Sequence, residues 1–404
     1  MALLVLCLSC SLIFMLWATH SRSRPELAIS SDVLRHQMNE SRRTFRNSIS
    51  ALNSSVNGKR SAHASICSER ETNVAFLKVH NAGSTTSLNI FYRFAMVHGL
   101  NVVLPRTLNS HYLSFDKSLA LPNIYPIPKN ETYNILANHV VYNKLAFSSV
   151  RDKNTVNVAI AREPTAQFVS AAIYHDLHRK LKNNDDSQKL GFQEMIEDFV
   201  TNPGKYKNVN VFWVHNRMSA DFGLREKDFY NTRYIDGVIR NISREFTLVM
   251  ITELYEESLV LLKRRLCWDM KDILFIEVKV HRGDRRDLTQ TQALSEGLKK
   301  WNSADYKLYH FFKEELLNKI ENEGNHFQGE VAYFKKVRQK LINFCRQNND
   351  KNDTLVIPVS RWNTEFAITP VDCELMTMSE IPMWRMMKKR AAQRLELLMP
   401  KKVS

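Results

Sequence analysis

Lys78 and His80 stand two residues apart in the segment FLKVHNAGSTT, whose composition suits the binding of an anion. Gly83 permits a tight backbone turn, and the hydroxyl residues after it would open a helix, where backbone N–H groups and the helix dipole favour negative charge. The lysine can reach a phosphate or a leaving oxygen, and histidine titrates in the range useful for accepting a proton. A helix capped by Ser84 or Thr85 after a strand would give the same local pattern without any bound anion.

A second candidate anion site lies in the segment VAIAREPTAQFVS, in which Arg162 ends an apolar run and Pro164 can begin a helix. Ser170 follows nearly two helical turns later, so its hydroxyl and the arginine can converge on one phosphate. The forked, permanently charged guanidinium suits that role. An ion pair of Arg162 with Glu163 or with another acid is the alternative interpretation.

The elements that must position these residues alternate along the chain from about residue 73 onwards. We expect strands at 74–77, 102–104, 156–160 and 246–251, and helices at 87–97, 164–178, 255–266 and 303–320. This alternation predicts an α/β fold with a central, mostly parallel sheet flanked by helices. Both candidate sites then fall where a strand leads into a helix. Because the first segment lacks the Gly-x4-Gly-Lys-Ser/Thr spacing of a P-loop, generic triphosphate hydrolysis is disfavoured.

The two strand–loop–helix sites, roughly 80 residues apart, resemble the 5′-phosphosulfate loop and the 3′-phosphate site of sulfotransferases. Further motifs in the same order resemble those of the galactose-3-O-sulfotransferase family, which includes galactosylceramide (cerebroside) sulfotransferase. The motifs are FLKVHNAGS, NIFYRF, NILANH, IAREP, LYEESLVLLK, LCW, DILF, and WN followed by Asp305 and Leu308-Tyr309. The resemblance covers about 73–345, most of the part expected to fold.

The resemblance implies a P-loop-like sulfotransferase fold and a reaction that moves a sulfuryl group from 3′-phosphoadenosine 5′-phosphosulfate onto the 3-OH of galactose. The acceptor would be a galactose-terminated glycolipid or glycan, and no metal is expected to take part. Two alternatives stay open: a lumenal sulfotransferase with a different carbohydrate acceptor, and a catalytically silent, carbohydrate-binding member of the fold. A homodimer is left open as well.

The resemblance also assigns roles to individual residues. Lys78 would stabilise the bridging oxygen and the sulfuryl charge, His80 would be the general base for the acceptor hydroxyl, and His139 would be a further active-site group. The residues implied to bind the donor are Lys78, Asn81, Gly83, Ser84, Thr85, Thr86, Arg162 and Ser170.

One departure from the family pattern concerns charge at the first loop. The family sequence usually reads Lys-Thr-His-Lys-Thr-Gly-Ser, whereas this chain has Val79, Asn81 and Ala82 where the family has threonine, lysine and threonine. Asn81 can donate a hydrogen bond but supplies no positive charge. We therefore expect weaker donor binding or a slower reaction, and the substitution also motivates the silent alternative.

The N-terminal residues predict entry into the secretory pathway. Ala2 to Ala18 is an almost unbroken apolar run, just long enough to span a bilayer, and a cleaved signal peptide is the alternative to a retained anchor. We divide the chain into an anchor, 1–20, a lumenal stem, 21–72, a sulfotransferase domain, 73–375, and a basic tail, 376–404. With the family resemblance, this organisation implies a single-pass type II protein of the Golgi membrane whose catalytic domain is lumenal.

Other features of the sequence agree with a lumenal setting. Four cysteines outside the apolar run, an even number, allow three disulfide pairings between which the sequence does not choose. They are Cys67, Cys267, Cys345 and Cys373. Five glycosylation sequons begin at Asn39, Asn53, Asn130, Asn241 and Asn352.

The chain is strongly basic, with a net charge of +15 and a pI of about 9.5, which favours an anionic partner. No nucleic-acid-binding motif supports DNA or RNA, and a nucleotide with several phosphates fits equally well. The basic, Met-rich segment 376–404 suits either an amphipathic helix on a membrane surface or a helix that packs on the domain.

Overall fold

The computed structural model describes residues 69–398 apart from 108–111, 115–116, 118, 151, 183–189, 207–208, 278–287, 290 and 348–351. All described residues belong to one compact unit, 62–404. The expected anchor, 1–20, and nearly all of the expected stem lie outside them. No helix within the described ranges is both long enough and apolar enough to cross a membrane.

The core of the protein is a four-stranded parallel sheet. Its strands are β1 (Val74–Leu77), β2 (Ile135–Leu136), β3 (Val156–Ala161) and β4 (Leu248–Ile251), in the order β2-β1-β3-β4. The strands are short and apolar because helices cover both faces of the sheet, so that no alternation with polar residues is required. The expected α/β class with a parallel sheet and flanking helices is confirmed.

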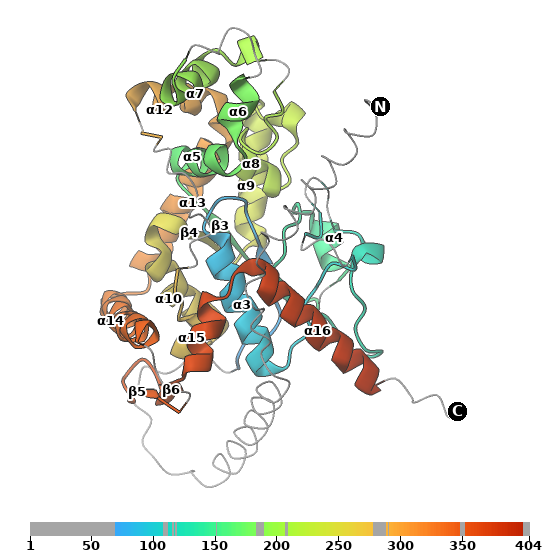
Figure 1. The fold of residues 1–404 in the computed structure, drawn as a ribbon, viewed down its shortest axis with the longest axis vertical. Coiled ribbons are helices and arrows are strands. Elements are labelled where there is room, and N and C mark those ends of the chain that lie inside the picture. The colour runs from blue at the N-terminus through green and yellow to red at the C-terminus, as the bar shows by residue number, and fades with distance from the viewer. Residues whose placement is uncertain are drawn as a thin grey trace, which may run out of the picture. The chain divides into compact units, whose positions relative to one another are not determined.

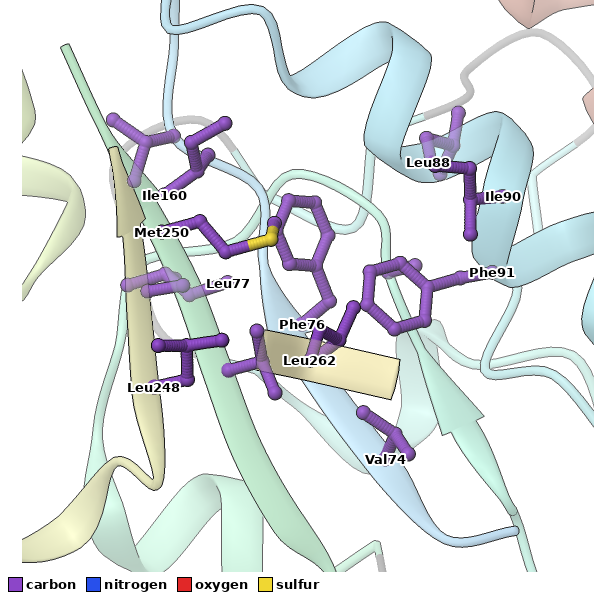
Figure 2. Close-up of a cluster of buried hydrophobic side chains, with 14 of the residues drawn as sticks. Val74, Phe76, Leu77, Leu88, Ile90, Phe91, Ile160, Leu248, Met250 and Leu262 are labelled. Atoms are coloured by element: carbon purple, nitrogen blue, oxygen red, sulfur yellow. The ribbon is translucent and has the colours of Figure 1, made fainter. Parts of the chain in front are cut away.

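The helix that follows β1 packs directly on the sheet. This helix, α3 (Ser84–His98), stacks the ring of Phe91 on that of Phe76 from β1, with 4.8 Å between the ring centroids. Figure 2 shows these rings among buried aliphatic side chains from β3, β4 and α10 (Tyr255–Leu266). The α3 face opposite the sheet contacts the C-terminal helix α16 (Glu380–Leu398), which crosses it in Figure 1.

A separate group of helices has its own hydrophobic cluster, away from the sheet. It consists of α5 (Pro164–Tyr174), α6 (Leu177–Lys182), α7 (Phe192–Thr201) and α12 (Gln292–Trp301), drawn together in the upper part of Figure 1. Because α5 begins immediately after β3, this lobe is connected to the sheet edge at which the candidate phosphate sites lie.

The remaining elements complete the two cores. The helices are α4 (Lys144–Ser148), α8 (Arg217–Asp221), α9 (Thr232–Glu245), α11 (Met270–Ile273), α13 (Ser303–Glu321), α14 (His326–Arg346) and α15 (Pro370–Thr377). Short 3-10 turns are η1 (Leu121–Asn123), η3 (Pro203–Tyr206), η4 (Glu226–Asp228) and η5 (Thr252–Leu254), and a hairpin joins β5 (Leu355–Ile357) to β6 (Phe366–Ile368). A disulfide between Cys345 and Cys373 ties α14 to α15. Cys267 is also disulfide-bonded.

The sequence predicted several boundaries correctly and others wrongly. The strand at 74–77 and the helix at 255–266 are confirmed. The helix expected over 164–178 is interrupted, because Asp176 adopts a left-handed conformation with φ of 51° between α5 and α6. The strand expected at 102–104 is reduced to a single bridge from Val102 to β2, because the neighbouring segment offers it almost no partner.

Candidate active site

The candidate residues lie at the carboxyl edge of the sheet. Lys78 follows β1, His139 lies shortly after β2 and Arg162 follows β3. The chain leaves β1 for β2 on one side and then crosses to β3 on the other, so that the edge between β1 and β3 is a topological switch point. Ligands of open α/β sheets bind at such points.

The loop between β1 and α3 is held by internal hydrogen bonds. Asn81 and Gly83 both have positive φ, of 58° and 71°, and the backbone therefore turns sharply into α3. The buried hydroxyl of Ser84 donates to the carbonyl of Val79 at 2.6 Å. The Thr252 hydroxyl, at the end of β4, lies 2.8 Å from the Ala82 carbonyl oxygen.

The loop directs the amino end of α3 outward. Gly83 is exposed and caps the helix without any side-chain hydrogen bond. The N–H of Thr86 reaches the Gly83 carbonyl at 3.2 Å. The first N–H groups of a helix have no partner within it, so this end of α3, with Ser84 and Thr85, is suited to an anion. The helix-cap interpretation and the anion-site interpretation are therefore compatible, with Gly83 rather than Ser84 or Thr85 as the cap.

Lys78 is buried, 2% exposed, between a histidine and a carboxylate. Its Nζ lies 2.6 Å from Nε2 of His139 and 3.0 Å from Oε2 of Glu380. His139 Nδ1 is 2.9 Å from the Lys78 carbonyl oxygen, which can only accept, so Nδ1 carries the proton and Nε2 accepts from the lysine. Burial lowers the pKa of Lys78, whereas the charge of Glu380 acts in the opposite direction.

His80 forms a dyad with Asp221 from α8. The Nδ1 atom of His80 lies 2.9 Å from Asp221 Oδ2, and the His80 backbone N–H donates to the same oxygen at 2.8 Å. Since the carboxylate can only accept, Nδ1 carries the proton. The other ring nitrogen, Nε2, is buried and has no hydrogen-bond partner among the described residues. With Nδ1 protonated, Nε2 of the neutral ring is the nitrogen that could accept a proton.

Arg217 keeps the dyad's carboxylate ionised. Its Nη2 donates to Asp221 Oδ1 at 2.5 Å, and both side chains are 1% exposed. Burial alone would raise the pKa of Asp221, but the charge of Arg217 and the contacts with His80 hold it below the ordinary value. The guanidinium lies over the ring of Phe212, 4.4 Å from its centroid, which offsets part of its loss of water.

The two histidines stack on each other. The ring centroids of His80 and His139 are 3.9 Å apart, and the ring of Tyr112 lies nearly parallel to both, 5.0 Å from His139 and 6.3 Å from His80. Burial lowers the pKa of both imidazoles, and that of His139 falls well below its ordinary value. Both rings are therefore neutral near pH 7, the state required of a general base.

The second candidate site is joined to the first through Asn81. Arg162 Nη1 donates to the Asn81 carbonyl at 3.1 Å, and the Asn81 side-chain amide lies 3.5 Å from the hydroxyl of Ser170. Burial lowers the pKa of Arg162, opposed by the charges of Glu253 and Glu163. The structure thus brings the two predicted groups close together through Asn81, while the role of each residue stays a prediction.

Three functional candidates were not found from the sequence. Asp221 and Arg217 occur as an i, i+4 pair on a short helix, a spacing that is common on protein surfaces. Glu380 lies in the segment we expected to be a basic tail. In the sequence, the arginine and aspartate of the segment NRMSAD, four residues apart, were the one indication of a charged pair, and this indication is weak.

The described ranges contain no group of three or more histidine, cysteine, aspartate or glutamate side chains that could hold a metal ion. That the reaction needs no metal remains a prediction. The groups that are present, namely the helix N-terminus, Lys78 and Arg162, have the chemistry to hold a nucleotide with several negative charges.

Several known proteins are similar to this chain in sequence. A mouse (Mus musculus) protein named galactose-3-O-sulfotransferase 3 is 29% identical over 282 residues, which cover 67% of this chain and 63% of that protein. Human galactose-3-O-sulfotransferase 2 is 29% identical over 293 residues, covering 70% and 71%. Human galactosylceramide sulfotransferase is 26% identical over 290 residues, covering 70% and 66%. The family model described as galactose-3-O-sulfotransferase matches residues 1–360, and the chain belongs to that family.

Proposed function

We propose that the protein transfers a sulfuryl group from 3′-phosphoadenosine 5′-phosphosulfate to the 3-OH of a terminal galactose on a glycolipid or glycan. The observation that carries the proposal is Nε2 of His80, which has no partner within the described part of the chain. The Nδ1 atom of the same ring is fixed by Asp221, beside Lys78 and the amino end of α3. The family membership and the names of the relatives, which specify galactose and galactosylceramide, support the choice of acceptor.

The transfer requires one proton acceptor and one group to stabilise the leaving oxygen. His80 Nε2 accepts the proton of the acceptor hydroxyl as that oxygen forms its bond to sulfur. The bond between sulfur and the bridging oxygen breaks, and the electron pair stays on the departing 5′-phosphate. Lys78 offsets the charge that develops there, as positioned cations do in phosphoryl transfer.

Donor binding would use the two anion sites together. The N–H groups of Ser84 and Thr85 would hold the 5′-phosphate at the amino end of α3. Arg162 and Ser170 would hold the 3′-phosphate, which is the group that distinguishes this nucleotide from common adenosine nucleotides. Asn81 contacts both of these residues and would set the spacing between the sites.

The cellular setting is part of the same proposal. We propose a type II protein of the Golgi membrane, anchored by residues 1–20, with the catalytic unit in the lumen. Three sequon asparagines fall within the described residues, and all three are exposed: Asn130, Asn241 and Asn352. The disulfide between Cys345 and Cys373 also suits an oxidising compartment.

The test is a transfer assay with the full-length chain and radiolabelled donor. Galactosylceramide and a galactose-terminated N-acetyllactosamine are offered as acceptors, beside a His80→Ala control. Label on galactose in the wild type and none in the control supports the proposal, and linkage analysis identifies the hydroxyl. Nucleotide binding without transfer to any glycan would instead favour the catalytically silent alternative.

A further inference from the structure

The C-terminal helix α16 places a carboxylate in the candidate donor site. Oε2 of Glu380, the first residue of α16, lies 3.0 Å from Lys78 Nζ and 3.4 Å from the hydroxyl of Thr85. The Glu380 side chain is 16% exposed. Thr85 is in the first turn of α3, so a negative charge already lies against the helix end that suits an anion.

This position is imposed by the packing of α16 on α3. Met383, Trp384 and Met387 of α16 are buried in the main core. The Asn89 side chain of α3 donates to the Leu375 carbonyl at 2.8 Å, and Arg390 of α16 donates to the Met96 carbonyl of α3 at 2.7 Å. Leu375 belongs to α15, so the first bond fixes the segment that leads into α16, and the second bond fixes α16 itself. Glu380 reaches Lys78 because its helix is held there by these contacts.

The charge balance of the loop differs from that of the family pattern at two points. Asn81 supplies no positive charge where the family usually has a lysine, and Glu380 pairs with Lys78, the remaining loop lysine. Helix α16 also lies beyond residue 360, where the family match ends. The carboxylate thus comes from a segment outside the matched region.

We propose that Glu380 is an internal competitor of the donor's 5′-phosphosulfate group and thereby sets the affinity for the donor. The inference rests on the proposed function, since it takes the donor to be a 3′-phosphorylated adenosine nucleotide. An anion at the amino end of α3 would share Lys78 with Glu380, whose carboxylate already accepts one of the three N–H groups of the ammonium. Like charges that approach closely in a partly buried site weaken binding.

The test compares two nucleotides on the full-length chain by isothermal titration calorimetry near pH 7. Adenosine 3′,5′-bisphosphate has the 5′ anion, and adenosine 3′-monophosphate lacks it. The variant is Glu380→Gln, which keeps the shape and removes the charge. The matched control is Glu396→Gln, an exposed residue on the same helix. Thermal unfolding without nucleotide, measured in parallel, checks that each variant is folded.

We expect Glu380→Gln to bind the bisphosphate about tenfold more tightly than the wild type, with unchanged affinity for the monophosphate. Glu396→Gln should resemble the wild type with both nucleotides. A folded Glu380→Gln whose affinity for the bisphosphate is equal to or lower than that of the wild type would overturn the inference and leave the proposed function standing. If no form of the chain binds the bisphosphate, the proposed donor class is wrong and the inference fails with it.

Discussion

At the scale of single residues, Asp221 determines which nitrogen of His80 is available for chemistry. In Asp221→Asn the side-chain amide can donate toward Nδ1, which would move the ring proton to Nε2 and remove the base. We expect kcat to fall about 10²–10⁴-fold, the usual contribution of general acid–base catalysis, with little change in the donor KM. Steady-state sulfate transfer with the donor varied measures both.

The control for this variant is Asp236→Asn, since Asp236 is 42% exposed and its carboxylate pairs with Lys307, away from the dyad. It should keep wild-type kcat. A wild-type rate in Asp221→Asn would show that the dyad does not orient the base, and a rise in KM alone would assign Asp221 to binding.

The pH dependence of the rate follows from the burial of two groups. Burial lowers the pKa of His80 from its ordinary 6.5, so the base stays neutral, and kcat stays high, below pH 6.5. Burial lowers the pKa of Lys78 from its ordinary 10.5. As the pH rises, the activity that depends on the positive charge of Lys78 should therefore begin to decline below pH 10.5. Measuring kcat at saturating donor avoids titration of the free donor's phosphates. An acid limb above pH 6.5 would contradict the assignment of His80 as the base.

Asn81 provides a test of the charge missing from the loop. Its φ of 58° suits asparagine, which tolerates the left-handed region better than most residues. Asn81→Lys should lower the donor KM severalfold by adding a cation, at a cost in stability of roughly 1 kcal/mol from the strained backbone. Asn81→Gln has comparable strain and no charge, and should not lower KM. Equal donor KM values in the two variants would mean that charge at this position does not matter.

The sequence predicted those parts of the site that lie in short continuous motifs. Lys78 and His80 were recognisable because the strand, the turn and the helix start fall within a dozen residues. Asp221 is 141 residues from His80 in the chain, and Glu380 is 302 residues from Lys78. Such contacts depend on where α8 and α16 dock, which is decided by burial of apolar faces and carries no local signal.

At the scale of elements, prediction succeeded where an apolar run has clear limits. The strand β1 is entirely buried, and α10 ends at Leu266, before Cys267 in a left-handed conformation. It failed where a local choice depends on neighbours: the segment 102–104 has strand-like residues but only a single bridge to β2. The lobe helices α7 and α12 were not predicted. The apolar face of each is short, and it is buried only where the two helices pack on each other.

The disulfide between Cys345 and Cys373 is an element-level restraint on the site, because it ties α14 to the segment that leads into α16. Closing a 28-residue span, the bond should stabilise the protein by about 3 kcal/mol relative to the reduced chain. We expect Cys345→Ser with Cys373→Ser to unfold at a correspondingly lower urea concentration. Disulfide mapping confirms that only this bond is lost.

The same variant tests whether α16 depends on the bond for its position. Buried contacts of Met383 and Trp384 hold the helix independently, so we expect sulfate transfer at 25 °C to change less than threefold despite the lower stability. A fall in the donor KM of the folded variant, as expected when Glu380 leaves Lys78, would show that the disulfide, rather than the packing on α3, positions Glu380.

At the scale of the whole molecule, the charge and the sequons bear on where the protein works. A net charge of +15 favours anionic ligands, but two of the cations at the candidate site, Lys78 and Arg217, already pair with carboxylates. The excess positive charge therefore lies mostly outside the site. This excess charge can attract an anionic nucleotide from a distance, while the residues of the site itself determine the affinity.

Glycosylation tests the proposed lumenal location directly. The side chains of Asn130, Asn241 and Asn352 are exposed, so an oligosaccharyltransferase in the lumen could reach all three. We expect the protein from animal cells to gain mobility on treatment with peptide N-glycosidase. Replacing the three asparagines by glutamine should remove part of that shift, whereas glutamine at the exposed non-sequon position Asn154 should remove none. Because glycan transfer occurs only on the lumenal side, an untreated chain of unmodified mass would place these surfaces outside the lumen and overturn the type II orientation.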